Sequence, residues 1–157
     1  MTIRLLTVGK TDVAWVKEGL DLYSSRLRHY APFSIEEIPQ LKGVASLSKD
    51  EIKSREGALI LKSLKEGETL ILLDERGKKM RSKAFAEFVS EVLVRSRGGI
   101  VFAVGGAYGF SEDVYRRSSY MISLSDMTFS HQMVRVIFAE QLYRAFTIMK
   151  GEPYHNE

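Results

Sequence analysis

The sequence predicts an α/β fold built on a mostly parallel sheet with helices on both faces. The first observation is an alternation of short apolar segments with longer segments whose apolar residues have helical spacing. The second is that the short segments are apolar throughout, which is typical of parallel strands buried on both faces. The third is size, because 157 residues, 45% of them hydrophobic, can bury one core but hardly two. We therefore expect residues 1–157 to form a single domain.

The first half of the chain supplies two of the expected strands and two of the helices. Thr11 and Asp12 precede a run with helical spacing, so we expect them to cap a helix that Pro32 ends. Gly57 weakens the second helix, because glycine in a helix interior is less favourable than alanine by about 1 kcal/mol. The expected elements are strands at residues 3–8 and 34–38, a helix between residues 12 and 32, a loop at 42–48 and a helix over 49–64.

The second half repeats the alternation and ends in a long helix. Ser111 is followed by two acids, which is typical of a capped helix N-terminus. The last helix keeps the helical period over four turns, up to Met149. The expected elements are strands at 69–73, 100–104 and 120–124, a turn at 74–78, a helix beginning at Ser82, a short helix after Ser111, and a helix from about residue 132 to Met149.

Composition excludes several classes of protein. There is no cysteine and there are only three separated histidines, which argues against disulfides, thiolate nucleophiles and a bound metal. No apolar run approaches the roughly 18 residues of a membrane span, and the N-terminus lacks a signal-peptide pattern, so we expect a cytoplasmic protein without membrane attachment. The net charge of +3 points only weakly to a polyanionic partner. Basic clusters at residues 26–29, 78–81 and 116–117 either form a surface for such a partner or are simply solvated.

Three loops begin where expected strands end. They follow Leu73, Val104 and Leu124. Ligands of parallel sheets bind outside the carboxyl ends of the strands, so these three loops are expected to converge on one pocket.

The loop that starts at Gly105 and Gly106 lets main chain approach a ligand closely, and it is equally consistent with a tight strand-to-helix turn. It does not match a dinucleotide fingerprint, which follows the first strand and has an acid about 20 residues further on. It also lacks the Gly-Lys-Ser/Thr ending of a phosphate-binding Walker loop. A nucleotide-dependent oxidoreductase is therefore disfavoured.

The loop at residues 125–130 combines hydroxyls and main-chain groups with a methionine and a phenylalanine. That mixture suits a purine ring and a thioether or sulfonium better than a polyphosphate. The alternative is a Ser/Thr-rich cap of the last helix.

Polar residues near the C-terminus are the remaining candidates. Ser130 and His131 are adjacent and lack a G-x-S-x-G elbow, which excludes a hydrolase pair, and His131 is also a candidate helix cap. Glu140 and Arg144 are spaced for an ion pair within the last helix. The tail at residues 153–157 carries Tyr154 and His155, which are either stacking groups for an unpaired base or part of a frayed end.

Taken in order, these segments resemble the ribosomal RNA large subunit methyltransferase H family of SPOUT methyltransferases. The resemblance spans the chain, although Ser130 stands where the family often has proline. It is carried by Val8-Gly9-Lys10, the strand end at Glu36 to Pro39, Leu73-Asp74 with Gly77-Lys78, Val104-Gly105-Gly106 with Gly109, Ser123-Leu124-Ser125 with Met127-Thr128-Phe129, His131-Gln132-Met133-Val134-Arg135, Glu140-Gln141-Leu142-Tyr143-Arg144-Ala145, and Tyr154-His155.

The resemblance implies a homodimer with a C-terminal trefoil knot, a feature otherwise nearly absent from proteins. It implies S-adenosylmethionine as the cofactor and methylation of N3 of a pseudouridine in helix 69 of large-subunit (23S) ribosomal RNA, with the assembled ribosome as the substrate. The cofactor contacts that it implies are Leu73, Gly105, Leu124, Ser125, Asp126, Met127, Thr128 and Phe129.

Side-chain roles in the reaction are hypotheses from position. His131 is the candidate proton acceptor and Arg135 the candidate group that steadies a developing anion. The candidate RNA-binding residues are Tyr143, Arg144, Tyr154 and His155. Two alternatives stay open: a SPOUT enzyme acting on another RNA such as tRNA, and a non-catalytic RNA-binding dimer.

Overall fold

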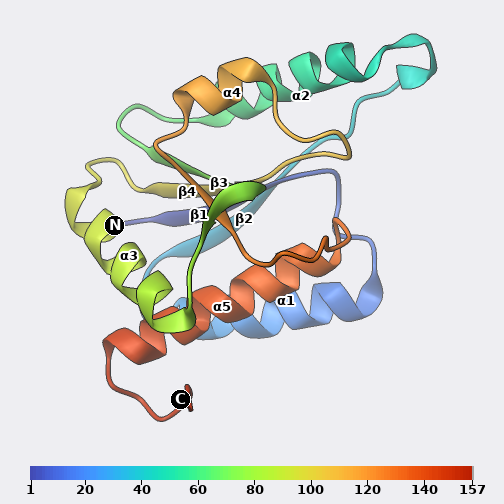
Figure 1. Cartoon of the computed structure of the whole chain (residues 1–157). Coiled ribbons are helices and arrows are strands. Elements are labelled where there is room, and N and C mark those ends of the chain that lie inside the picture. Colours follow the sequence, from blue (N-terminus) through green and yellow to red (C-terminus); the bar gives the residue numbers. More distant parts are fainter. Residues whose placement is uncertain (157) are drawn as a thin grey trace.

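The computed structural model describes residues 1–156 and has the expected α/β architecture, with a parallel sheet between two layers of helices (Figure 1). The strand order is β2-β1-β4-β3-β5. Helices α2 and α4 cover one face, and α1, α3 and α5 cover the other (Figure 1). The elements are β1 (Ile3–Val8), α1 (Ala14–Leu27), β2 (Phe33–Ile38), a 3-10 turn (Val44–Ser46), α2 (Lys49–Ser63), β3 (Thr69–Lys79), α3 (Ser82–Arg95), β4 (Ile100–Val104), α4 (Glu112–Arg117), β5 (Tyr120–Ser123) and α5 (Met133–Met149).

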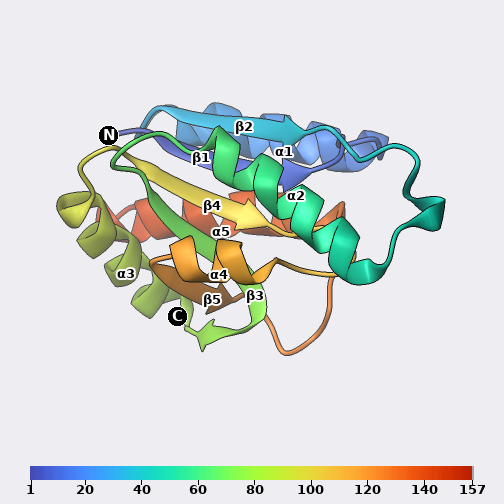
Figure 2. The same cartoon turned by 90° about the horizontal axis from the view of Figure 1, so that it is seen from above.

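Strands β1, β3 and β4 form the buried centre of the sheet. Every residue of β4 is buried, as its unbroken apolar sequence predicts. On the α1 and α5 side, Phe102 of β4 packs on Phe138 of α5 with ring centroids 4.7 Å apart. Seen from above, β1, β2 and β4 lie side by side and end toward the same edge, whereas the extension of β3 turns away from it (Figure 2).

The prediction that Thr11 and Asp12 cap the first helix is wrong. The residue at the N-cap is Val13, and no side chain accepts a hydrogen bond there. The hydroxyl of Thr11 accepts instead from the Arg135 guanidinium, and the main-chain N–H of Asp12 donates to Gln132. Tertiary contacts with the start of α5 have replaced a local cap.

The second helix begins with a capping box that the prediction did not use. The Ser48 hydroxyl accepts from the N–H of Glu51, and the Glu51 carboxylate accepts from the N–H of Ser48. Gly57 sits inside this helix for a packing reason, because a Cβ there would lie 2.2 Å from the Ser111 hydroxyl oxygen.

The predicted turn at residues 74–78 is also wrong, because β3 runs through it to Lys79. The pairing with β5 shifts register between Leu73 and Lys78, so both of these residues align with Ile122. A Cβ on Gly77 would lie about 2.5 Å from the main chain of Ile122, so only glycine fits this approach. The shift turns the end of β3 at the point where the predicted pocket lies.

The other predicted elements are confirmed within a residue or two, except the end of the first helix. Helix α1 ends at Leu27, five residues before Pro32, which was expected to end it. Ser111 caps α4 as expected, since its hydroxyl accepts from the N–H of Val114. None of the helices in residues 1–156 is long and apolar enough to cross a membrane. The trefoil knot implied by the resemblance stays a prediction.

Candidate active site

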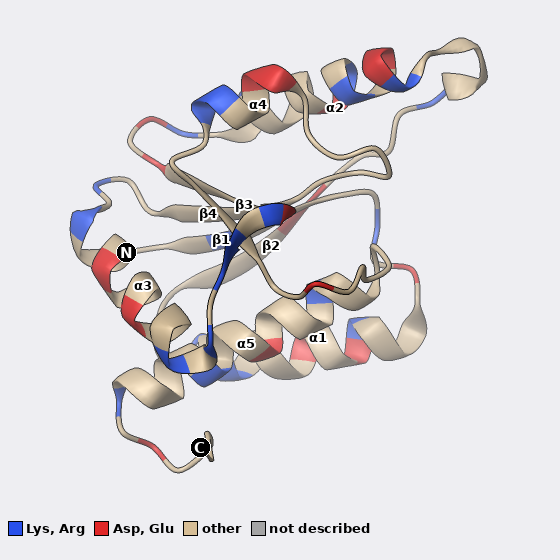
Figure 3. Cartoon of the chain, viewed as in Figure 1, with Lys and Arg blue, Asp and Glu red and all other residues tan. Residues whose placement is uncertain are grey.

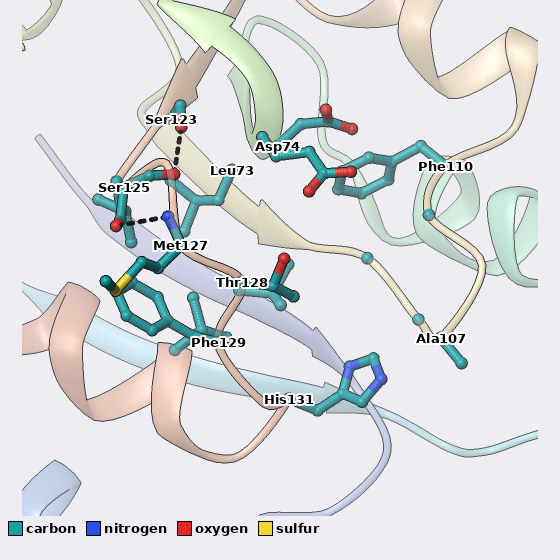
Figure 4. Close-up of a pocket in the computed structure, with 17 residues that line it drawn as sticks. Leu73, Asp74, Ala107, Phe110, Ser123, Ser125, Met127, Thr128, Phe129 and His131 are labelled. Carbon is teal, nitrogen blue, oxygen red and sulfur yellow. Dashed lines mark hydrogen bonds between the residues drawn. The ribbon is translucent and has the colours of Figure 1, made fainter. Parts of the chain in front are cut away.

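The three strand-end loops meet in one cavity of about 270 Å³, as the strand-end rule predicts. Its walls come from the ends of β3, β4 and β5 and from the segment that leads into α5 (Figure 4). The lining residues are Leu73, Asp74, Glu75, Val104, Gly105, Gly106, Ala107, Gly109, Phe110, Ser123, Leu124, Ser125, Met127, Thr128, Phe129, His131 and Val134.

The glycine loop is both a tight turn and a wall of the cavity. The carbonyl of Gly106 accepts from the N–H of Gly109, which has a φ of 85°. A Cβ on Gly105 would meet Gly109 and Phe110 at about 3.3 Å. The two interpretations of this loop from sequence are therefore compatible, because the close turn is what exposes main chain to the cavity.

The loop after β5 is held by its own serines. The Ser123 hydroxyl donates to the Ser125 carbonyl at 3.0 Å, and the Ser125 hydroxyl accepts from the N–H of Met127 at 2.9 Å (Figure 4). The Ser130 hydroxyl accepts from the N–H of Met133, the first residue of α5, at 3.1 Å, whereas Gln132, which occupies the N-cap position, forms no side-chain cap. Met127 and Thr128 remain free to face a ligand.

Asp126 is placed differently from its neighbours. Its side chain is 77% exposed, forms an ion pair with Lys79 and does not line the cavity. The predicted cofactor contact of Asp126 is therefore not supported as a side-chain contact in this arrangement.

Asp74 is a pocket residue that the sequence analysis missed as a ligand contact. Its side chain is only 9% exposed, and its carboxylate accepts from the Tyr115 hydroxyl at 2.6 Å and from the N–H of Arg76 at 2.8 Å. Burial, followed by the hydrogen bond to Asp74, raises the pKa of Tyr115. Figure 4 shows the carboxylate beside the Phe110 ring, toward the glycine loop. An acid directly after a buried parallel strand was the signal that could have identified it.

His131 lines the cavity at the start of the last helix, on the side opposite Asp74 (Figure 4). No side-chain hydrogen bond to its ring occurs within residues 1–156, and the hydroxyl that bonds to the first N–H of α5 belongs to Ser130 rather than to His131. The imidazole is therefore available to a ligand rather than committed to the fold.

Arg135 lies away from the cavity. It is 1% exposed, and its guanidinium donates to the carbonyls of Val8, Gly9 and His131 and to the Thr11 hydroxyl. Burial lowers its pKa. These contacts tie the end of β1 to the start of α5, so the geometry does not support the predicted role of Arg135 at a developing anion.

The four predicted RNA-binding residues form one cluster at the far end of α5. Arg144 donates to Glu140 at 2.6 Å, contacts Nδ1 of His155 at 3.0 Å and lies over the Tyr154 ring at 4.8 Å. The rings of Tyr143 and Tyr154 are 4.7 Å apart, edge to face. Tyr154 and His155 are thus packed on the helix; Glu157, the last residue of the predicted tail, is outside the described residues.

The cavity and this cluster are far apart within one chain. Arg144 lies eleven residues beyond Met133, where α5 begins next to the cavity, which corresponds to about 16 Å along a helix axis. The structure therefore brings the predicted cofactor contacts other than Asp126 together with His131, but not with the predicted RNA contacts.

A parallel sheet with a main-chain-lined cavity at its carboxyl edge defines a class of α/β nucleotide-cofactor protein, and comparison with known proteins specifies it. The model of the family described as "Predicted SPOUT methyltransferase" matches residues 1–155. A solved structure titled as a probable methylase family protein from Haemophilus influenzae Rd KW20 shares the fold with a TM-score of 0.50 and 14% identity over 95% of this chain and 66% of that one. The chain belongs to the SPOUT methyltransferase family.

Relatives that match the chain over its full length identify the group of SPOUT methyltransferases that it resembles in sequence. The protein named "Ribosomal RNA large subunit methyltransferase H" from Parabacteroides distasonis is 50% identical over 157 residues, 100% of both chains. Proteins with the same name from Christiangramia forsetii and Bacteroides thetaiotaomicron are 49% and 47% identical over at least 99% of this chain. The resemblance seen in the sequence is thereby confirmed at the level of that methyltransferase H family.

Proposed function

We propose that this chain methylates N3 of a pseudouridine in helix 69 of large-subunit ribosomal RNA, with S-adenosylmethionine as the donor. The observation that carries the proposal is the cavity where Leu73, Gly105 and the loop after Leu124 meet. Family membership and the shared name of its full-length relatives support it.

The residues of the cavity fit this cofactor. Main chain around Gly105 and Ser125 offers donors and acceptors for an adenine edge, while Leu73 and Phe129 offer apolar surface. The acids Asp74 and Glu75 lie at the cavity wall, where they favour the positive charges of a sulfonium and an ammonium. No trio of His, Asp or Glu able to hold a metal occurs within residues 1–156, and the proposed reaction uses none.

The reaction asks little of side chains beyond positioning. When bound, the cofactor supplies an already activated methyl group. The chain must hold N3 in line with that methyl group, and it must accept the imide proton. His131 is the proposed acceptor, because its ring lines the cavity and carries no side-chain hydrogen bond within the described residues.

The RNA contacts are proposed to come from the cluster of Tyr143, Arg144, Tyr154 and His155. Since this cluster lies about three helical turns along α5 from the cavity of its own chain, we propose that a homodimer brings it near the cavity of the partner subunit. Basic residues also lie along the extension of β3 that leads to α3 (Figure 3). Lys78 is proposed to meet a phosphate there, while Lys79 is paired with Asp126. A dimer, a C-terminal knot, one domain over residues 1–157 and a cytoplasmic location all belong to this proposal.

The decisive experiment measures transfer of labelled methyl groups to assembled ribosomes, free 23S RNA and tRNA. We expect labelling of ribosomes and, after digestion, a single methylated pseudouridine. Gly105→Trp should abolish it by filling the cavity, whereas Val94→Ser, at an 85% exposed site on α3, should not. Labelling of tRNA alone would show that the RNA target is wrong, and absence of cofactor binding in calorimetry would favour a non-catalytic RNA-binding dimer.

The proton-acceptor role has its own test. His131→Ala should reduce turnover by roughly a hundredfold or more, because a positioned general base contributes about that factor. Cofactor affinity should change little. Turnover equal to that of the wild type would show that His131 is not the base.

A further inference from the structure

Glu56 is a buried carboxyl group without a protein partner. Its residue is 7% exposed on α2, and no protein group within residues 1–156 hydrogen-bonds to its Oε1. Burial raises the pKa of this carboxyl. A buried polar group that lacks a partner destabilises the fold, so Glu56 weakens the ligand-free protein.

The group that faces this carboxyl is the wall of the cofactor cavity. A Cβ on Gly106 would lie 2.4 Å from Oε1 and 2.7 Å from Oε2 of Glu56. Gly106 lines the cavity and Glu56 does not, so the main chain of Gly106 stands between the carboxyl and the cavity. The next residue of the helix, Gly57, packs equally closely on Ser111 at the other end of the same loop.

The loop has an unpaired donor beside this unpaired acceptor. Within residues 1–156, the main-chain N–H of Ala107 donates to no protein acceptor, whereas Gly106 pairs with Gly109 in an isolated antiparallel bridge. A small rotation of the peptide between Gly106 and Ala107 would direct this N–H at the carboxylate, and glycine tolerates such a rotation.

We propose that Glu56 is a positioning residue of the donor pocket: its carboxylate accepts a main-chain N–H of the Gly106–Ala107 turn when the cofactor is bound. This inference rests on the proposed function of the cavity. The unpaired carboxyl of the free state becomes paired in the loaded state, so part of the cofactor's binding free energy comes from a group that never touches it.

The test compares Glu56→Gln with the wild type by calorimetric titration of S-adenosylmethionine and by thermal unfolding without ligand. We expect the variant to bind the cofactor about tenfold more weakly, since a hydrogen bond to a charged group is lost. Its unfolding temperature should equal or exceed that of the wild type, because a neutral amide is easier to bury than a carboxylate. The matched control is Glu51→Gln on the same helix, which keeps the capping box and should change neither quantity.

A cofactor affinity within roughly twofold of the wild type would overturn the inference. A clear drop in unfolding temperature would overturn it too, because Glu56 would then stabilise the free protein. If the wild-type chain itself binds no cofactor, the proposed function is refuted, which is a different result from equal binding by both proteins.

A double-mutant cycle tests the contact itself. Gly106→Ala places a methyl group on the carboxyl and should weaken cofactor binding, while the same change in a Glu56→Ala background should weaken it less, because the space is vacated. Equal losses in the two backgrounds would show that Glu56 and Gly106 act independently and would contradict the proposal.

Discussion

Arg135 and Arg144 lie on the same helix, α5, but their surroundings differ. Arg135 stabilises the fold, whereas Arg144 lies where it can contact a partner. Arg135 is fully buried, and three carbonyls and a hydroxyl accept from its guanidinium. Arg144 keeps a quarter of its side chain exposed and shares its charge with Glu140 and two residues of the tail. Both were predicted to act on RNA or its reaction, but only Arg144 has a surface on which to do so.

The largest expected effect is the loss of stability when the buried arginine, Arg135, is replaced. Arg135→Met should lower the free energy of unfolding by about 3 kcal/mol or more, because each buried acceptor left without a donor costs about 1 kcal/mol or more. Urea unfolding followed by circular dichroism measures it. A loss below about 1 kcal/mol would mean that β1 and α5 are held together without this guanidinium.

The next largest effect is expected on methylation, when the partly exposed arginine, Arg144, is replaced. Arg144→Gln should reduce methylation of ribosomes about tenfold or more, while cofactor affinity stays unchanged, because the cluster lies far from the cavity of its own chain. Its ion pair with Glu140 is an intrahelical pair, so the loss of stability should be a few tenths of a kcal/mol. The dependence of ribosome binding on salt should also weaken by about one ion. Equal salt slopes for the two proteins would remove Arg144 from the phosphate contacts.

The difference between the two arginines was not visible in the sequence. Helical spacing predicted α5 correctly, and Phe138 and Leu142 on its apolar face are buried. The apolar strands likewise predicted the sheet, because both signals are local and repeated. Arg135 belongs to the buried face as well, but its acceptors come from the end of β1, more than 120 residues away. Contacts with residues that far away in the sequence leave no periodic pattern from which they could be predicted.

The cavity, too, could be predicted from the sequence only in part. Its position followed from the strand-end rule, so Leu73, Gly105 and Leu124 were correctly brought together. Asp74 was assigned to a turn, because a register shift inside a strand has no sequence signature beyond its glycine. Asp126 was grouped with its neighbours, and only the structure shows that it turns toward Lys79.

The smallest predicted effect on methylation comes from changing Tyr154 in the C-terminal tail. Tyr154→Phe keeps the ring over which Arg144 lies and removes only the hydroxyl, which donates to Glu140, so methylation should fall only a few-fold, by about 1 kcal/mol. Tyr154→Ala removes the ring as well and should cost roughly tenfold or more if a base stacks there. Equal activity of the two variants would exclude stacking.

The pH dependence of the stability of Tyr154→Phe tests which protonation state of Tyr154 the cluster stabilises. Burial and then hydrogen bonding raise the pKa of Tyr154 in the folded state, so the protonated phenol is the stabilised form. Its contribution to stability is therefore fully present below the unfolded pKa of about 10 and is lost as pH rises above it. The difference in unfolding midpoint between wild type and variant should be constant from about pH 7 to 9 and shrink above about pH 10. A difference that grows at high pH would mean that the phenolate is the form that the cluster binds.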